Sequence, residues 1–329
     1  RELSEAIRAH TIPLVELTEA CLQRLEQYGP RLGAVVTITR DRALREARAA
    51  EREIAAGQWR GPLHGIPYGV KDLLATAGDP TTWGAAPYRE QRFDFDATVV
   101  QRLTRAGAVL VAKLAMIELA GGFGYRQADA SFTGPARTPW NLRYWAGGSS
   151  SGPGAAVSAA LVPFAIGSET WGSITTPAAF SGITGLRPTY GRVSRYGAMA
   201  LSWSMDKLGP MCRTADDCGL VLAAIAGADP RDPSASTREF AHAPESARRR
   251  RFRIGVLKNA TAGVQKEVAD AFDASLRIIA DFADVLPDVE LPDHPYGTAA
   301  SLIIDAVGAS AFGDLLETGG AELVRPPED

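Results

Sequence analysis

The sequence predicts an α/β fold built around a largely buried sheet. Apolar runs of strand length alternate with segments whose apolar residues recur at helical spacing, which is typical of α/β proteins. The 329 residues are 46% hydrophobic and 22% charged, as in ordinary globular proteins, and this excludes intrinsic disorder as a general description. The length suits either about two domains or one large α/β domain, and it can bury a large core without disulfides or metal.

The individual elements follow from apolar periodicity and from the glycines and prolines that interrupt it. Gly29-Pro30 and Gly107 mark the points where two helices are expected to stop. Two apolar strands each lead into a lysine, Lys71 and Lys113. We expect helices over 13–28, 41–56, 96–106, 154–160, 214–226 and 264–282, and strands over 34–38, 65–72, 108–112, 164–167 and 253–257.

The charge and the cysteine content exclude several classes of protein. The chain has 35 Lys and Arg against 38 Asp and Glu, a formal net charge of −3, so we expect neither nucleic acid nor an anionic membrane as a partner. The uncharged window 145–168 is long enough to span a bilayer, but its glycines, serines and prolines argue against a membrane span. Three cysteines without a C-x-x-C pair and four scattered histidines predict no disulfide framework and no zinc site, in a cytoplasmic setting.

Two Gly/Ser turns contain the densest functional signal. They are Gly147–Gly154 (GGSSSGPG) and Gly167–Ile174 (GSETWGSI), which lie on either side of one helix–strand unit. Such turns can bring their hydroxyls together at one sheet edge, and glycines leave backbone N–H groups open to an oxyanion. Taken alone, the turns are equally consistent with serines that only cap helices.

Three other enzyme hypotheses compete for these residues. A phosphate site is weakly indicated, because no G-x-x-x-x-G-K-[ST] motif occurs. Residues 148–152 match G-x-S-x-G, which would make Ser150 an elbow nucleophile served by His242 or His294, but no buried strand precedes them. Ser204 and Lys207 match S-x-x-K without its usual companion motifs.

The chain resembles the amidase signature family of serine hydrolases over about half its length. The matching pieces occur in the family's order with fitting gaps, so coincidence is excluded as an explanation. The resemblance implies a single large domain with a mixed central sheet covered by helices on both faces. The pieces are GPLHGIP (61–67), VKD (70–72), DATVV (96–100), GGSSSG (147–152), GSETWGSI (167–174), PAAF (177–180), GLRPTYG (185–191) and LGPM (208–211).

The resemblance also implies a Ser–cisSer–Lys triad. Ser173 would be the acyl-accepting nucleophile, Ser149 would relay its proton and follow a cis peptide bond, and Lys71 would be the base. Such a lysine must be uncharged, so we expect burial or a nearby positive charge to lower its pKa, and the apolar residues 66–70 could supply the burial. The oxyanion hole would be formed by backbone N–H groups at Thr170, Trp171, Gly172 and Ser173. Contacts to substrate are expected from Gly121, Gly122, Ser150 and Trp171, and no cofactor is implied.

Two departures from the family pattern narrow the expected substrate. Trp171 replaces a glycine beside the expected oxyanion hole, where an indole could form an aromatic wall. Thr175 stands where several members of the family have an arginine that binds a substrate carboxylate. We therefore expect a small-molecule amide with a neutral, apolar acyl group, and esters or carbamates as possible further substrates.

Three regions are expected within this domain. Residues 1–60 would form an N-terminal helical segment on the core, residues 61–228 the catalytic core, and residues 229–329 a peripheral α/β part. Members of the family commonly run longer, and no closing strand is predicted near Asp329, so we expect the C-terminal part to be incomplete. The alternatives are the A subunit of an amidotransferase that releases ammonia from glutamine, or a catalytically silent member of the family. The sequence leaves a homodimer open.

Overall fold

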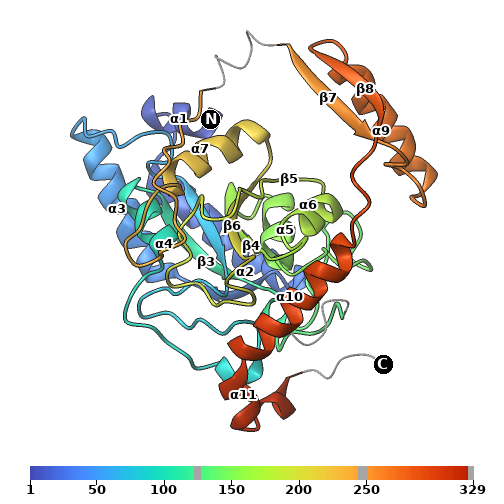
Figure 1. The fold of residues 1–329 in the computed structure, drawn as a ribbon. Coiled ribbons are helices and arrows are strands. Elements are labelled where there is room, and N and C mark those ends of the chain that lie inside the picture. The colour runs from blue at the N-terminus through green and yellow to red at the C-terminus, as the bar shows by residue number, and fades with distance from the viewer. Residues whose placement is uncertain (122–126, 244–250, 325–329) are drawn as a thin grey trace. The chain divides into compact units, whose positions relative to one another are not determined.

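The computed structural model describes residues 1–121, 127–243 and 251–324. These residues fall into two compact units, one formed by residues 1–242 and 300–329 and the other by residues 243–299. The larger unit contains a six-stranded mixed sheet, which confirms the predicted α/β fold (Figure 1). The described part of the chain has no helix that is both long and apolar enough to cross a membrane.

The central sheet has the strand order β1-β3-β2-β4-β6-β5. Strand β2 runs parallel to its neighbours β3 and β4, whereas the β1–β3, β4–β6 and β5–β6 pairs are antiparallel. Because parallel neighbours end at the same sheet edge, the C-terminal residues of β2 and β4 lie close together. The strands are β1 (Val35–Ile38), β2 (Pro67–Lys71), β3 (Val109–Leu114), β4 (Phe164–Glu169), β5 (Thr184–Gly185) and β6 (Lys207–Cys212).

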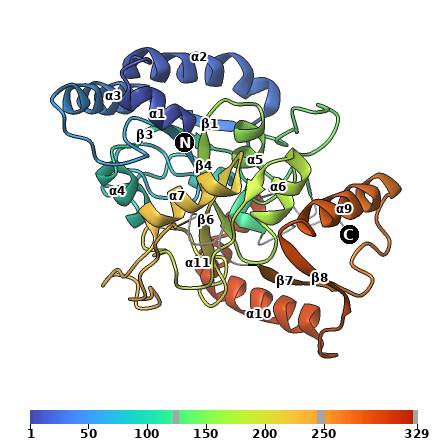
Figure 2. The ribbon, with the colours of Figure 1, turned by 90° about the horizontal axis from the view of Figure 1, so that it is seen from above.

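Helices cover both faces of this sheet, as the resemblance implied. In the view from above, α2 and α3 lie side by side along one side of the unit (Figure 2). The helices of the larger unit are α1 (Glu2–Arg8), α2 (Leu14–Leu32), α3 (Arg40–Ala55), α4 (Thr98–Arg105), α5 (Ser151–Ser158), α6 (Thr175–Ser181), α7 (Ala215–Ile225) and α11 (Gly313–Glu317), with short 3-10 helices at Ala86–Tyr88, Glu118–Gly121 and Gly320–Leu323. Helix α10 (Tyr296–Ala311) begins in the smaller unit and ends in the larger one.

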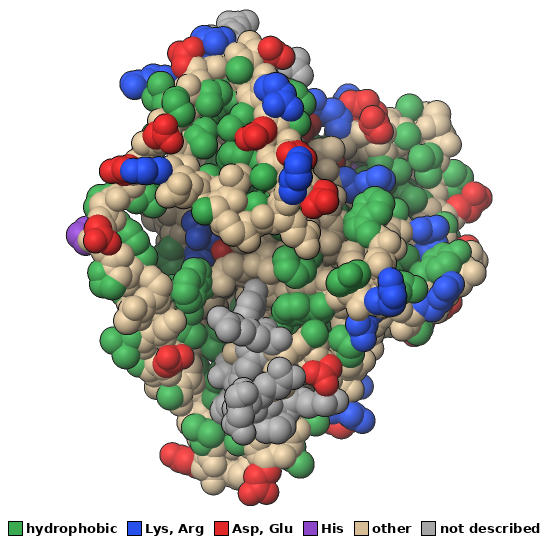
Figure 3. All heavy atoms as spheres, turned by 90° about the vertical axis from the view of Figure 1, so that its right-hand side faces the viewer, with side chains coloured by type: hydrophobic (Ala, Val, Ile, Leu, Met, Phe, Trp, Pro, Cys, Tyr) green, Lys and Arg blue, Asp and Glu red, His purple; other side chains and the backbone are tan. Residues whose placement is uncertain are grey.

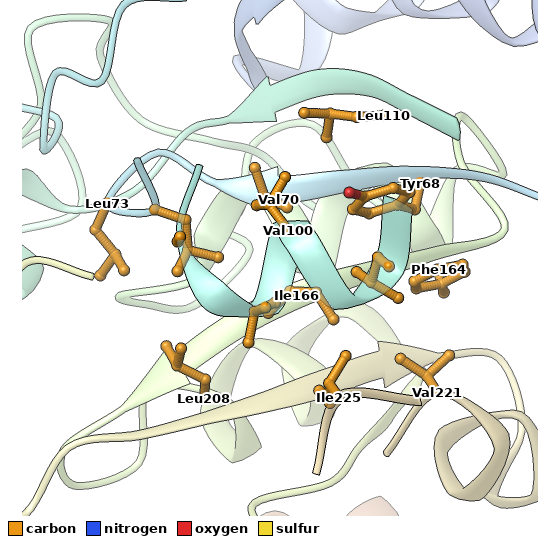
Figure 4. Packing of buried hydrophobic residues seen from close by; sticks show 14 of the residues in the cluster. Tyr68, Val70, Leu73, Val100, Leu110, Phe164, Ile166, Leu208, Val221 and Ile225 are labelled. Atoms are coloured by element: carbon orange, nitrogen blue, oxygen red, sulfur yellow. The ribbon is translucent and has the colours of Figure 1, made fainter. Parts of the chain in front are cut away.

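Alternation along the strands divides the core into two apolar clusters. Successive side chains of a strand point to opposite faces, so neighbouring residues enter different clusters. Phe164 and Ile166 of β4 pack with α4 and α7, as Figure 4 shows, whereas Ala165 packs with α2, α3 and α5. In β3, Leu110 belongs to the first cluster and Val111 to the second. The sheet is therefore buried on both faces.

Three predicted helix boundaries are wrong, including the end of the helix predicted over 264–282, which stops at Ile279. The first long helix does not stop at Gly29-Pro30 but continues to Leu32, where Gly33 ends it in a left-handed conformation with φ 60°. Pro30 therefore lies inside the last turn of this helix and does not end it. Helix α5 begins at Ser151, three residues before the predicted start at Gly154.

The smaller unit is a parallel β–α–β arrangement. Strand β7 (Phe252–Leu257), helix α9 (Lys266–Ile279) and strand β8 (Ala283–Val289) follow one another, and β7 pairs with β8. The strand and helix predicted here are confirmed. Strand β8 was missed, and it contains Pro287, a residue that argues against a strand. On the face seen in Figure 3, acidic and basic side chains are mixed, in keeping with the small net charge.

Candidate active site

The sheet edge where β2 and β4 end places a lysine beside two serines. Lys71 is the last residue of β2 and is 0% exposed. Its Nζ lies 2.7 Å from Ser149 Oγ and 2.9 Å from Ser168 Oγ and donates a hydrogen bond to both. Val70 is paired with Ile166 in the parallel β2–β4 ladder, and this register places Ser168 beside the lysine.

Burial gives this lysine the properties of a base. Desolvation lowers the pKa of Lys71 from its ordinary value of 10.5 to about 7, against the opposing influence of the Asp206 and Glu169 carboxylates. A substantial fraction of the amine is therefore uncharged near neutral pH. An uncharged amine in contact with a serine hydroxyl can take its proton.

Ser149 lies in the turn that leads into α5. The peptide bond between Gly148 and Ser149 is cis, as the resemblance implied. The Ser149 carbonyl accepts a hydrogen bond from the Ile117 N–H group at 3.1 Å. The backbone contact and the Lys71 contact together hold the Ser149 hydroxyl in one place.

Ser173 is joined to this turn through the backbone. The Ser150 N–H group donates to the Ser173 carbonyl at 3.2 Å, and Ser173 is only 4% exposed. The Glu169 carboxylate accepts hydrogen bonds from the N–H groups of Ile174 and Thr175 at 2.8 and 2.9 Å. These bonds fix the segment that holds Ser173 next to the segment that holds Ser149.

The residues between Glu169 and Ser173 form a tight bend. Asp206 and Lys207 form hydrogen bonds with Thr170 in this bend. Thr170 Oγ1 lies 2.5 Å from Asp206 Oδ1, and Lys207 Nζ donates to the Thr170 carbonyl at 2.8 Å. Gly172 has φ 93°, a conformation that favours glycine. The Trp171 side chain is 53% exposed. That backbone N–H groups of this bend bind an oxyanion remains a prediction.

The Ser150 hydroxyl is bonded within the protein, and the substrate contact of Gly121 stays a prediction. Ser150 is fully buried, and its hydroxyl donates to the Ser168 carbonyl and accepts from the Ser168 N–H group, so its hydrogen bonds are used within the protein. Gly121 is the last residue of a 3-10 helix and has φ 95°. Gly122, the other glycine predicted to contact substrate, lies outside the described residues.

The competing motifs are used in other ways. The Ser150 hydroxyl is bonded to the Ser168 backbone, and His242 Nε2 lies 2.8 Å from Asp216 Oδ1, so the described residues give the elbow hypothesis no contact between Ser150 and His242. Lys207 of the S-x-x-K match contacts the Thr170 carbonyl. Within the described ranges no three His, Cys, Asp or Glu side chains are grouped so that they could hold a metal ion.

Sequence reasoning missed Ser168, Asp206 and Lys207. Ser168 could have been found, because it stands near the end of a predicted strand in register with the one that leads to Lys71. Lys207 is the first residue of β6 and Asp206 precedes it, 37 and 36 residues beyond Thr170, and they carry no local signal. Their role follows from the antiparallel β4–β6 pairing, which sets Lys207 opposite Glu169.

A cavity of about 200 Å³ opens beside this site. Ser168, Thr170 and Asp206 form its polar side. The guanidinium groups of Arg195 and Arg231 also line it, and each is paired with an aspartate, Asp232 and Asp229 respectively. The rest of the lining is mainly apolar and includes Leu73, Ala120, Met199, Leu201, Trp203 and Leu208.

Comparison with known proteins places this geometry in a family. The family description "Amidase" matches residues 16–319. The chain belongs to the amidase family. It is 42% identical over 313 residues to the A subunit of the Glutamyl-tRNA(Gln) amidotransferase from Halorhodospira halophila, an alignment that covers 94% of this chain and 64% of that protein. The chain thus spans less than two thirds of the length of that relative.

Solved structures in the family share the fold. The native peptide amidase of Stenotrophomonas maltophilia superimposes with a TM-score of 0.84 and 36% identity, over 95% of this chain and 67% of that chain. The A subunit of the Glutamyl-tRNA(Gln) amidotransferase from Thermotoga maritima superimposes with a TM-score of 0.78 and 28% identity, over 94% and 67% of the two chains. A structure described as a vestigial protein complex that reveals the origins of an s-triazine catabolic enzyme reaches a TM-score of 0.88 at 34% identity, over 96% and 69%.

Proposed function

We propose that this chain is a serine amidase that cleaves a carboxylic amide through an acyl-enzyme on Ser173. The observation that supports this most directly is the contact between the buried Lys71 amine and the Ser149 hydroxyl at 2.7 Å, with the pKa of Lys71 lowered to about 7. A serine hydroxyl becomes a good nucleophile only when a neighbouring base takes its proton. Lys71 is that base in this proposal.

The reaction follows from the order of the three side chains. Uncharged Lys71 takes the Ser149 proton while Ser149 takes the proton of Ser173, and Ser173 Oγ adds to the amide carbonyl carbon. The tetrahedral intermediate collapses, the C–N bond breaks, and the amine leaves with the proton returned from Lys71 through Ser149. Water then attacks the ester carbonyl carbon and gives a proton to Lys71 through Ser149. The ester bond to Ser173 breaks, Ser173 Oγ takes the proton back through Ser149, and the carboxylic acid leaves. Backbone N–H groups of 170–173 would stabilise the oxyanion at both steps.

The proposed substrate has a neutral and apolar acyl group. The cavity beside Ser168 is lined mainly by apolar side chains, and its two arginines are already paired with aspartates. Thr175 offers no positive charge to a substrate carboxylate and instead donates from its N–H group to Glu169. Esters and carbamates of similar shape would react by the same steps.

A second candidate is the A subunit of an amidotransferase, which releases ammonia from glutamine. The 42% identity to such a protein from Halorhodospira halophila favours it. The absence of an arginine at Thr175 argues against it, because the carboxylate of glutamine needs a positive partner. Hydrolysis of simple amides by the isolated protein would support the amidase, and strict dependence on a partner and tRNA would support the amidotransferase.

Labelling with a fluorophosphonate probe tests the proposal. We expect the wild type to be labelled, Ser173→Ala to lose the label, and Lys71→Arg to lose at least about 100-fold in labelling rate because arginine stays charged. Ser275→Ala, which changes a serine of α9 in the smaller unit, is the matched control and should be labelled like the wild type. A folded wild type that takes no label would overturn the proposal and favour a silent member of the family.

A further inference from the structure

Two neighbouring residues, Asp206 and Lys207, both form hydrogen bonds with Thr170. Lys207 is the first residue of β6, and Asp206 precedes it. Asp206 Oδ1 accepts the Thr170 hydroxyl at 2.5 Å, and Lys207 Nζ donates to the Thr170 carbonyl at 2.8 Å. Neither contact belongs to the proton relay, because Thr170 lies three residues before Ser173 and its hydroxyl is bonded away from Lys71. The pair therefore acts on the backbone of the bend.

Asp206 and Lys207 are each fixed in position by further contacts. The second carboxylate oxygen of Asp206 accepts from the N–H groups of Leu201 and Ser202, at 2.9 Å each. Lys207 stands opposite Glu169 in the β4–β6 ladder, so its backbone position is set by the sheet. A side chain anchored in a sheet restrains its partner more strongly than one on a loop, because the sheet backbone moves little.

The Lys207 contact determines where the next N–H group points. A peptide unit is planar and trans, so its carbonyl and its N–H group point in opposite directions. The carbonyl of Thr170 and the N–H group of Trp171 belong to one such unit. An ammonium group that holds the carbonyl at 2.8 Å therefore directs the Trp171 N–H group away from β6. It also polarises the unit and strengthens that N–H group as a donor.

We infer that Lys207 is a positioning residue that aims the Trp171 N–H group at the oxyanion of the tetrahedral intermediate. This inference rests on the proposed function, since it gives Lys207 a part in the same reaction. It also explains how a bulky tryptophan is tolerated at this position. Only the backbone of Trp171 would serve the reaction, while its side chain remains 53% exposed.

Replacement of the lysine separates this role from simple packing. Lys207→Met keeps the length of the side chain and removes the donor, whereas Lys207→Gln keeps a neutral donor. The matched control is Lys258→Met, the same substitution at an exposed lysine of the smaller unit that is paired with Glu290. Turnover of an amide or ester that the wild type accepts is measured, together with binding of an alkyl boronic acid, which forms a tetrahedral adduct with an active serine.

We expect kcat of Lys207→Met to fall roughly 10- to 100-fold with KM within about twofold, because an oxyanion donor acts mainly on the transition state. Boronic acid affinity should fall by a similar factor, and Lys207→Gln should recover to within about fivefold of the wild type. A Lys207→Met enzyme with wild-type kcat, or a Lys207→Gln enzyme as impaired as Lys207→Met, would overturn the inference alone. A folded wild type with no label on Ser173 would overturn the proposed function and the inference together.

Discussion

Replacement of Lys71 by methionine should remove a specific pH dependence from the stability of the protein. Burial lowers the pKa of Lys71 from 10.5 to about 7 in the folded state. Between these two values the unfolded chain holds a proton that the folded protein does not. The free energy of unfolding of the wild type therefore rises with pH through this window, and below pH 7 the destabilisation by Lys71 is fully present.

The size of the effect follows from the shift. Each pKa unit corresponds to about 1.4 kcal/mol, so the whole shift amounts to roughly 5 kcal/mol. Between pH 7 and pH 9 the wild type should gain about 2 kcal/mol that Lys71→Met does not gain, because the folded amine is still partly protonated at pH 7. Below pH 6 the difference between the two proteins should stay constant.

Urea unfolding followed by tryptophan fluorescence measures this difference at pH 6, 7, 8 and 9. The signal reports the unit that contains Lys71, because all six tryptophans lie within residues 1–242. Lys258→Met, at an exposed side chain, should keep the pH dependence of the wild type. If the stability difference between the wild type and Lys71→Met is the same at pH 7 and pH 9, the amine is charged in the folded protein, and the base assigned here is wrong.

Three further predictions concern the reaction and the core. The labelling rate of Ser173 should rise about tenfold per pH unit below pH 7 and level off above it, since only uncharged Lys71 is a base; a profile measured with a fluorophosphonate that rises until pH 10 would contradict this. Asp72→Asn should lower the free energy of unfolding in urea by roughly 3–5 kcal/mol, because it leaves the fully buried Lys113 ammonium without the carboxylate 3.0 Å away. The double variant Asp72→Leu/Lys113→Met should recover part of the loss, and an unchanged unfolding midpoint for Asp72→Asn would refute the argument. Gly152→Ala should lower the free energy of unfolding by at least about 2 kcal/mol, because the added Cβ would clash with backbone atoms of Ala115 and Ala34. Gly313→Ala is the control: no atom lies within 4 Å of its added Cβ, so its free energy of unfolding should change by less than about 1 kcal/mol in the same assay.

Much of the fold could be predicted because the signals are local. Strand 108–112 is a short apolar run after Gly107, strand 164–167 is a short apolar run that ends at Gly167, and helices such as α3 show apolar residues at helical spacing. The predictions were wrong where packing or strand pairing overrode a local sequence signal. Gly29-Pro30 looks like a stop signal, but α2 packs against α3 and β1 and continues to Leu32. Strand β8 contains Pro287, which argues against a strand, but it forms by pairing with β7.

The sequence by itself determined which side chains are available for chemistry: a lysine at a strand end and serines in two glycine-rich turns, in an order shared with a known family. Only the tertiary structure decided what those groups can do. The pKa of Lys71 depends on desolvation by its neighbours in the fold, and the bend at Thr170 is held by Lys207 of β6 and by Asp206 just before that strand. The burial of Lys71 and the hydrogen bonds that hold the bend both come from residues that are distant in the chain, so no local pattern of residues can specify them.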